Sequence, residues 1–480
     1  MKGNEGDGLL FPTVSFAAFL VIVLIISWLV RPHPRLWRCW LLVASWIFYG
    51  WWDWRFVMLL MAVIGMNYLV GKAMVTWHTS QKAWLTVGIA ANLGALAFFK
   101  YYGFFVTSLH DLLRPVGLDP QIPLFEVILP IGVSFYIFES IAYLMELHRG
   151  IVSPLPLLDL ATYLSFFPKI LSGPITRASE FAPQLTHPTS AADVDGPVAF
   201  WLLGRGLFKK VVIASYLATA ITDGVFTTPG QYSAFETLAG IYGYTALIYV
   251  DFSAYTDMAR GIAMLLGFTL PENFSSPYIA TSIREFWSRW HMTLTRWLRD
   301  FLFQPLVVSR SRTRSARLRN LVVVMLLAGL WHGAAWTFVL WGGIHGIALA
   351  IERLRRETRR SRGLRPVTET GWVRLRRRLI TFHIVAFAWV FFRADTVAGA
   401  FEVLARLGSF GPAPAITPLL ILVLVSVFAF QYVPENWSTT VLAVFRRIGP
   451  VPQTAALGGL LLLVDALGPE GVPTFIYTGF

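Results

Sequence analysis

Two histidines interrupt a long apolar stretch of the sequence and are its only acidic or basic side chains. The stretch lies between Asn320 and Glu352. His332 stands in the run Gly-Leu-Trp-His-Gly, and His345 follows in Gly-Gly-Ile-His-Gly. An imidazole titrates near physiological pH, so it can take up or release a proton during a reaction. Both are therefore candidate functional residues, and a buried histidine bonded to a helix carbonyl is the alternative interpretation.

A second group of polar and aromatic side chains lies between Ser275 and Leu306. Its polar members are His291, Arg289, Arg296, Arg299 and Asp300. Its aromatic members recur at helical spacing: Trp290, Trp297 and Phe301. The pattern predicts an amphipathic helix at a membrane surface, with arginines reaching lipid headgroups. Because a guanidinium group pairs bidentately with phosphate oxygens, the same arginines are candidate ligands for an anionic substrate.

Further polar residues stand in apolar surroundings. Asp251, Ser253, Asp257 and Arg260 lie between Tyr249 and Phe268. Asp257 and Arg260 are three residues apart, so they can pair on one helix. Glu139 and Glu146 are seven apart and are expected to share a helix face, with a packing or partner-facing role. His383 is the remaining histidine in an apolar segment.

Several kinds of chemistry find no support in the sequence. It contains no phosphate-binding P-loop motif, no His-Glu-x-x-His or Cys-x-x-Cys pattern for zinc, and no Gly-x-Ser-x-Gly nucleophile motif. Cys39 is the single cysteine, so an intrachain disulfide is excluded. Two matches to the glycosylation sequon, at Asn273 and Asn436, are of a kind that arises often by chance.

The elements that carry these residues are predicted to be membrane helices. Of the 480 residues, 56% are hydrophobic and only 14% are charged, and the chain contains 19 tryptophans. Soluble domains are nearer one quarter charged. Apolar runs approach the roughly 20 residues that a helix needs to cross a bilayer. We expect an all-α, polytopic integral membrane protein with about 10–12 helices, including re-entrant or interfacial segments. The expected spans are 11–30, 36–52, 56–75, 84–106, 124–147, 198–221, 235–250, 321–350, 379–392, 418–432 and 455–467.

The net charge of +13 is concentrated in arginine-rich stretches. They lie at Ser309–Asn320 and Arg353–Arg378, and they predict cytoplasmic loops beside anionic lipid. Nucleic-acid binding is not supported, because no recognition module surrounds these stretches. Arg31, Arg35 and Arg38 follow the first span, which places the N-terminus outside.

The two arginine-rich stretches also predict a turn. If Arg319 and Arg353 are both cytoplasmic, the 33 residues between them must enter the membrane and return. A straight helix of that length would span about 50 Å, well beyond the bilayer. A turn near Gly329–Gly333 would hold His332 deep in the protein. One long tilted helix is the alternative.

Prolines mark a second irregular region. Pro168 and Pro174 interrupt the stretch Ser165–Leu185 and should break any helix there. We expect a re-entrant or interfacial segment. The chain is divided into N-terminal helices at 1–123, a core at 124–352, and a basic loop with C-terminal helices at 353–480.

Taken together, these stretches resemble the membrane-bound O-acyltransferase family. The resemblance rests on the stretches at Tyr249–Phe268, Phe286–Leu306 and Leu326–Gly346, with Leu129–Gly150 and Ser165–Leu185 in support. The chain is similar to the bacterial branch that acetylates alginate, cellulose or peptidoglycan or adds D-alanine to teichoic acid. It departs from that branch at Ala254, where glycine is usual, and in its tail at residues 473–480.

The resemblance implies transfer of an acetyl group from a cytoplasmic thioester, with acetyl-CoA as substrate and no bound cofactor or metal. The acceptor is expected to be a hydroxyl of a periplasmic partner protein or an exopolysaccharide, and the location a bacterial inner membrane. His332 is then the general base, kept neutral by burial among Trp331, Trp336 and Leu330. His291 orients a substrate or stabilises the oxyanion. His345 and His383 receive no catalytic role.

Three alternatives stay open at this point. One is D-alanyl transfer from a carrier protein to a cell-wall polymer. Another is a transporter or flippase that moves an acyl donor or a glycan. The third is a non-catalytic scaffold in a polysaccharide export complex.

Overall fold

Helices make up the regular structure of the described part of the chain, and no strand occurs there. The computed structural model describes residues 11, 13–117, 128–306, 313–364 and 370–447, with a few single positions between 452 and 462. Most of the predicted span at 455–467, the tail at 473–480 and the first arginines of Ser309–Asn320 lie outside these residues. The all-α expectation is confirmed for the described residues.

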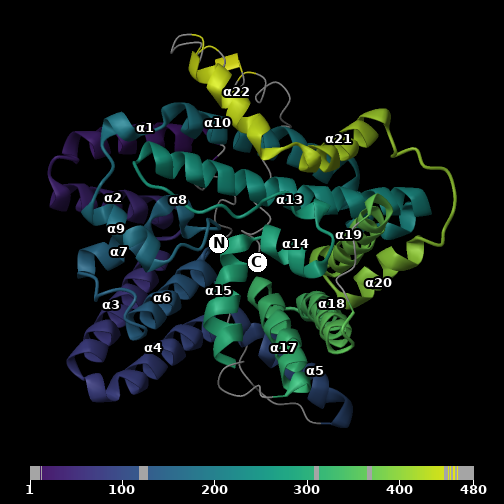
Figure 1. The fold of residues 1–480 in the computed structure, drawn as a ribbon, viewed down its shortest axis with the longest axis horizontal. Coiled ribbons are helices and arrows are strands. Elements are labelled where there is room, and N and C mark those ends of the chain that lie inside the picture. The colour runs from purple at the N-terminus through teal and green to yellow at the C-terminus, as the bar shows by residue number, and fades with distance from the viewer. Residues whose placement is uncertain are drawn as a thin grey trace. The chain divides into compact units, whose positions relative to one another are not determined.

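The helices form two compact units. Unit 1 comprises Met1–Leu203 and Asp257–Pro271, and unit 2 comprises Gly204–Thr256 and Glu272–Phe480. The helix α13 (Ala234–Leu265) contributes residues to both (Figure 1). The division at 1–123, 124–352 and 353–480 follows sequence features and stays a prediction.

Unit 1 begins with long apolar helices joined by short turns. Its main helices are α1 (Val14–Val30), α2 (Pro34–Gly50), α3 (Trp54–Thr76), α4 (Gln81–Leu96), α5 (Tyr102–Leu113) and α6 (Val133–His148). A π-helical turn at Ala97–Tyr101 joins α4 to α5. Shorter helices follow: α7 (Leu157–Ser165), α8 (Phe167–Ile170), α9 (Ala178–Thr186) and α10 (Gly196–Leu207). The predicted spans near 11–30, 36–52 and 56–75 coincide closely with α1, α2 and α3.

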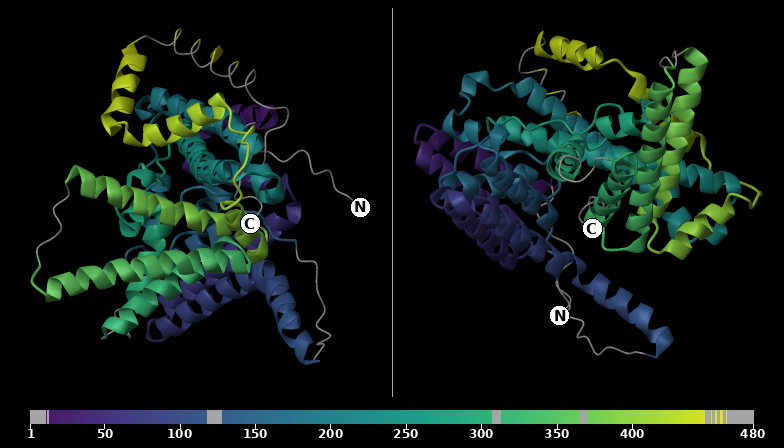
Figure 2. Two further views of the ribbon diagram at one scale, coloured as in Figure 1. Left: turned by 90° about the vertical axis from the view of Figure 1, so that its right-hand side faces the viewer. Right: turned by 60° about the horizontal axis from the view of Figure 1, so that its bottom comes forward.

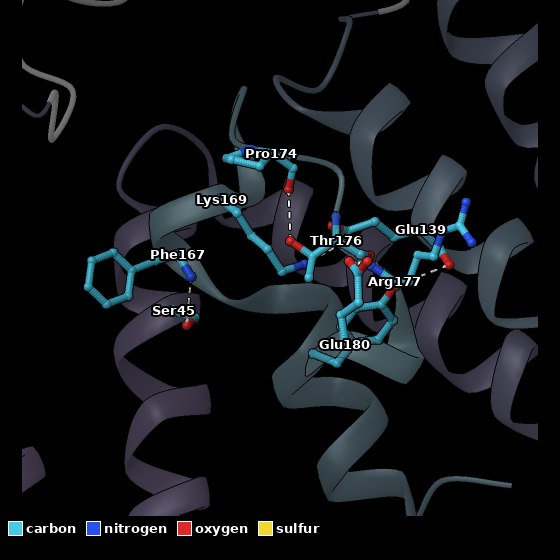
Figure 3. A network of polar contacts seen from close by, with 9 residues as sticks. Ser45, Glu139, Phe167, Lys169, Pro174, Thr176, Arg177 and Glu180 are labelled. Carbon is cyan, nitrogen blue, oxygen red and sulfur yellow. Dashed lines mark hydrogen bonds and ion pairs between the residues drawn. The ribbon is translucent and has the colours of Figure 1, made fainter. Parts of the chain in front are cut away.

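The proline-containing stretch of unit 1 is irregular, as its sequence predicts. Pro168 stands in the first turn of α8, where a missing N–H is tolerated, and residues 171–177 connect α8 to α9 without helix. Glu139 of α6 forms an ion pair with Lys169 and accepts the Thr176 N–H at 3.0 Å (Figure 3). One face of α6 therefore holds this stretch by its backbone.

Glu146 lies about two helical turns further along α6 than Glu139 and contacts the same proline-containing stretch. Its carboxylate accepts the backbone N–H of Ser179 at 3.0 Å and the Ser179 hydroxyl at 2.7 Å. Glu139 and Glu146 are both buried. The expected shared face is confirmed, and both carboxylates contact the stretch at 165–186 from that face.

Unit 2 contains the helices that carry the candidate histidines. Before α13 come a π-helical turn at Phe208–Ala214, α11 (Ser215–Leu217), a π-helical turn at Ala218–Thr222 and α12 (Asp223–Thr227). After it come α14 (Ile283–Arg289), α15 (Met292–Trp297) and a π-helical turn at Leu298–Phe303. The remaining helices are α17 (Arg314–His332), α18 (Trp336–Ser361), α19 (Gly371–Arg393), α20 (Val397–Arg406), α21 (Pro418–Ala429) and α22 (Glu435–Arg447).

Helices α17 and α18 form the predicted hairpin. The chain leaves helical conformation only at Gly333–Ala335, so the turn is confirmed and the single long helix is wrong. At the open end, Arg314 donates to the Leu354 carbonyl at 3.1 Å and pairs with Glu357 at 3.3 Å. The described parts of both arginine-rich stretches therefore lie at the same end of the hairpin. Helix α18 also lies alongside α19 (Figure 2).

Glycines allow α17 and α18 to approach closely. A Cβ atom on Gly329 would lie 2.1 Å from the Phe338 carbonyl oxygen, and one on Gly342 would lie 2.2 Å from the Met325 carbonyl oxygen. Small residues at such positions are typical of closely packed helices in membranes. Gly343, one residue further, meets its nearest neighbour at 3.6 Å, which is an ordinary contact.

Length and composition alone identify two membrane-crossing candidates among the described residues. They are Trp54–Thr76 and the continuous stretch His78–Val116, and Val14–Val30 and Pro418–Tyr432 are apolar but shorter. The predicted number of spans therefore stays a prediction.

Candidate active site

His332 is the last residue of α17 and is enclosed by aromatic rings. Its side chain is buried, and its ring centroid lies 4.9 Å from Trp331, 5.0 Å from Trp341 and 5.2 Å from Phe392. Each contact is edge-to-face, a favourable arrangement for aromatic rings. The enclosure thus comes from α17, α18 and α19.

The expected burial of His332 is confirmed, and Trp331 is one of the rings that enclose it. Trp336 is the first residue of α18 and is 57% exposed. Trp341 lies more than one helical turn further along α18 and packs edge-to-face on His332. Trp341 was not among the expected neighbours.

His291 stands between two short helices, and not within one amphipathic helix as predicted. Helix α14 ends at Arg289, α15 begins at Met292, and His291 has φ 42° and ψ 54°. The left-handed conformation is uncommon for a residue with a Cβ atom, and such strain gathers at functional sites. The expected single helix is interrupted because the chain bends at Trp290 and His291. His291 is fully buried.

Trp331 connects the two candidate histidines. The ring centroid of His291 lies 6.1 Å from Trp331, and that of His332 lies 4.9 Å from the same ring. On its other side, His291 packs edge-to-face on Phe252 at 4.8 Å. The structure thus brings together two histidines that are 41 residues apart in the sequence.

Two consecutive lysines bind polar side chains of α13, the helix that carries Phe252. Lys210 pairs with Asp251 at 2.6 Å, and both side chains are buried. Lys209 donates to the Ser253 hydroxyl at 3.1 Å. Both lysines lie in the π-helical turn at Phe208–Ala214, a geometry that is frequent at functional sites. These lysines were not among the residues predicted from the sequence, although two lysines inside a predicted span were a usable signal.

His345 belongs to the same aromatic cluster. It is fully buried, its ring lies 5.1 Å from Trp341, and its Nδ1 accepts the Trp287 indole N–H at 3.3 Å. An indole nitrogen only donates, so the proton of a neutral His345 is on Nε2. His383, in contrast, is exposed and contacts the Tyr242 hydroxyl at 2.8 Å.

The three candidate arginines differ in their surroundings. Arg289 pairs with Glu285 at 3.1 Å and donates to the Ser275 carbonyl at 3.1 Å. Arg299 is exposed and pairs with Asp300 at 2.7 Å, and Arg296 is half-buried. The pairing of Asp257 with Arg260 on α13 stays a prediction.

Comparison of the chain with known proteins identifies the family to which it is related. Residues 98–385 match the model of the membrane-bound O-acyltransferase family, and this range contains both His291 and His332. A protein of Azotobacter vinelandii named probable alginate O-acetylase is 40% identical over 378 residues, which cover 77% of this chain and 72% of that protein.

Two other relatives are named for different activities. A peptidoglycan O-acetyltransferase of Helicobacter pylori is 34% identical over 432 residues, or 82% of this chain and 79% of that protein. A teichoic acid D-alanyltransferase of Streptococcus thermophilus is 28% identical over 287 residues, or 55% of this chain and 68% of that protein. The resemblance seen in the sequence is thereby confirmed. The chain belongs to the membrane-bound O-acyltransferase family and is an acyltransferase of the membrane.

Proposed function

We propose that the chain transfers an acetyl group from a cytoplasmic thioester, such as acetyl-CoA, to a hydroxyl on the opposite side of a bacterial inner membrane. The acceptor is an exopolysaccharide or a periplasmic partner protein. The proposal rests on one observation: the rings of His291 and His332 both pack against the Trp331 ring. All three residues lie inside the range that matches the family. The names of the acetylating relatives support acetyl as the group transferred.

In the proposed reaction, His332 acts as the general base. Its imidazole takes the proton of the acceptor hydroxyl while that oxygen attacks the thioester carbonyl carbon. The carbon–sulfur bond then breaks, the ester remains on the acceptor, and the thiolate leaves and takes up a proton. His291 orients a substrate or stabilises the negative oxygen of the tetrahedral intermediate.

The donor binding that we propose uses Arg289, Arg296 and Arg299. Guanidinium groups suit the phosphates of a nucleotide-bearing thioester because they form paired hydrogen bonds with phosphate oxygens. Arg299 is the most accessible of the three, since 58% of its side chain is exposed.

Purified protein in lipid vesicles tests the proposed function. Labelled acetyl-CoA is supplied on one side, with oligosaccharides of mannuronate, cellulose or peptidoglycan type on the other. Formation of labelled ester that requires His332 supports the proposal. Movement of intact substrate without ester, or ester formation that is unchanged in His332→Ala, overturns it.

D-alanyl transfer is the second candidate, and the similarity to the teichoic acid D-alanyltransferase favours it. It uses the same base and the same attack on a thioester, with a carrier-bound D-alanyl group in place of acetyl. Supplying D-alanyl carrier protein in place of acetyl-CoA distinguishes the two donors.

A further inference from the structure

The turn that carries His291 is hydrogen-bonded to a short non-helical segment that precedes it in the sequence. The Met292 N–H donates to the Asn273 carbonyl at 3.0 Å, and the Ser275 N–H donates to the Arg289 carbonyl at 3.0 Å. These bonds bracket His291 on both sides. The segment Asn273–Ser275 is therefore hydrogen-bonded to the turn on both sides of His291.

The side chain of Asn273 adds two hydrogen bonds to this contact. Its Oδ1 accepts the Thr293 backbone N–H at 3.2 Å and the Thr293 hydroxyl at 2.6 Å. A backbone N–H can only donate, so the atom that faces it is the amide oxygen and the orientation of the carboxamide is fixed. Asn273 and Thr293 are both buried. The burial also keeps the sequon at Asn273 out of reach of glycosylation in the folded protein.

The conformation of His291 requires such support. The left-handed conformation is strained for a residue with a Cβ atom and persists only where its surroundings enforce it. Among the described residues, neither ring nitrogen of His291 has a hydrogen-bond partner. The direction of the ring is therefore set by its backbone and by the Phe252 and Trp331 rings, and not by a polar group bonded to it.

We propose that Asn273 is a positioning residue for His291. Its Oδ1 holds Thr293, and its carbonyl holds Met292, so the turn keeps the imidazole between Phe252 and Trp331 with both nitrogens available to the reacting groups. The inference rests on the proposed function of His291 and adds a residue outside the two histidines to that site. Asn273 acts through His291 and does not contact the substrate.

Four substitutions separate this role from a general loss of structure. Asn273→Ala removes the Oδ1 acceptor and is expected to lower kcat about 10²-fold, since displacements near 1 Å can cost that much, with little change in the KM for the donor. Thr293→Val removes one of the two donors and should cause a smaller loss. Asn273→Asp keeps an acceptor oxygen and should retain more activity than Asn273→Ala. Ser288→Ala is the matched control, because the Ser288 hydroxyl is exposed and donates only to the Glu285 carbonyl of its own helix.

A double-mutant cycle makes the dependence on His291 measurable. Residues that act through one another show non-additive effects. We therefore expect Asn273→Ala to cause no further loss in a His291→Ala background. An equal loss in both backgrounds overturns the proposal. A similar loss in Asn273→Asp and Asn273→Ala, at equal thermal stability, also overturns it, because the amide nitrogen would then be the group required.

A spectroscopic measurement tests the positioning without any turnover. In protein labelled with ¹⁵N-histidine, the His291 resonances are identified by their loss in His291→Ala. Asn273→Ala should shift or broaden them, whereas Ser288→Ala should leave them in place. Unchanged resonances in Asn273→Ala overturn the proposal even if the wild-type protein transfers no acetyl group, and an inactive wild type with shifted resonances contradicts only the proposed function.

Discussion

At the scale of single residues, the candidate site consists of imidazoles held by aromatic rings. The ring centroids of Trp331, Trp341 and Phe392 lie 4.9 to 5.2 Å from that of His332. Such rings exclude water and restrict rotation without offering a competing charge. The arrangement suits a base whose partner is a substrate hydroxyl.

Replacement of His332 tests this assignment directly. We expect His332→Ala to lower the rate of acyl transfer by about 10²–10⁴-fold, the usual contribution of a positioned general base. The rate is measured as ester formation in reconstituted vesicles, with insertion and thermal stability checked in parallel. His383→Ala is the control, because that histidine is exposed and outside the cluster. Equal rates for the two variants would contradict the assignment.

The sequence predicted the two histidines but not what positions them. His291 and His332 could be singled out because each lies in an apolar or aromatic run with a recognisable motif. The roles of Lys209, Lys210 and Asn273 depend on contacts between segments up to 44 residues apart, as for Lys209 and Ser253. Periodicity within one segment carries no information about such contacts.

At the scale of elements, the position of His332 depends on how closely α17 and α18 pack. Gly342→Ala would place a methyl group against the Met325 backbone, which cannot move aside as a flexible side chain can. We expect this variant to lose most of its activity and thermal stability. Gly343→Ala is the matched control on the adjacent residue, and it should behave like wild type. A stable and active Gly342→Ala protein would show that α17 and α18 can move apart without loss of function.

The contact between α6 and the proline-containing stretch of unit 1 gives a second prediction at this scale. Ser179→Ala removes one hydrogen bond to the buried Glu146 carboxylate. Bonds to charged groups contribute about 1.5–3 kcal/mol, so residues 165–186 should exchange backbone hydrogens faster. Hydrogen–deuterium exchange measures this, with Ser361→Ala as an exposed control. Unchanged exchange in Ser179→Ala would mean that the Ser179 hydroxyl does not contribute to holding the stretch.

Element boundaries were predicted well where one pattern dominated and poorly where the chain bends. Helices α1, α2 and α3 follow from largely apolar runs. The stretch Ser275–Leu306 has aromatic residues at helical spacing, yet the chain bends at His291, where Asn273 accepts hydrogen bonds from Met292 and Thr293. Local pattern could not reveal this tertiary effect.

At the scale of the whole molecule, the proposed multi-pass topology can be tested with single cysteines. In a Cys39→Ser background, Ser80→Cys lies at the α3–α4 connection and Trp54→Cys lies at the α2–α3 turn, and both native residues are exposed. We expect a membrane-impermeant thiol reagent to reach residue 80 from the cytoplasm and residue 54 from outside. Labelling of both from one side would contradict the proposed topology.

The hairpin of α17 and α18 also has a consequence for the biogenesis of the chain. At the open end of the hairpin both helices carry arginines, whereas the tip at Gly333–Ala335 carries no charge. Between Asn320 and Glu352, only His332 and His345 could ionise. In the proposed topology, the two helices would enter the bilayer from the cytoplasm as one unit, without translocating a charged loop. His332, the proposed general base, would then reach its depth in the membrane in the insertion step itself.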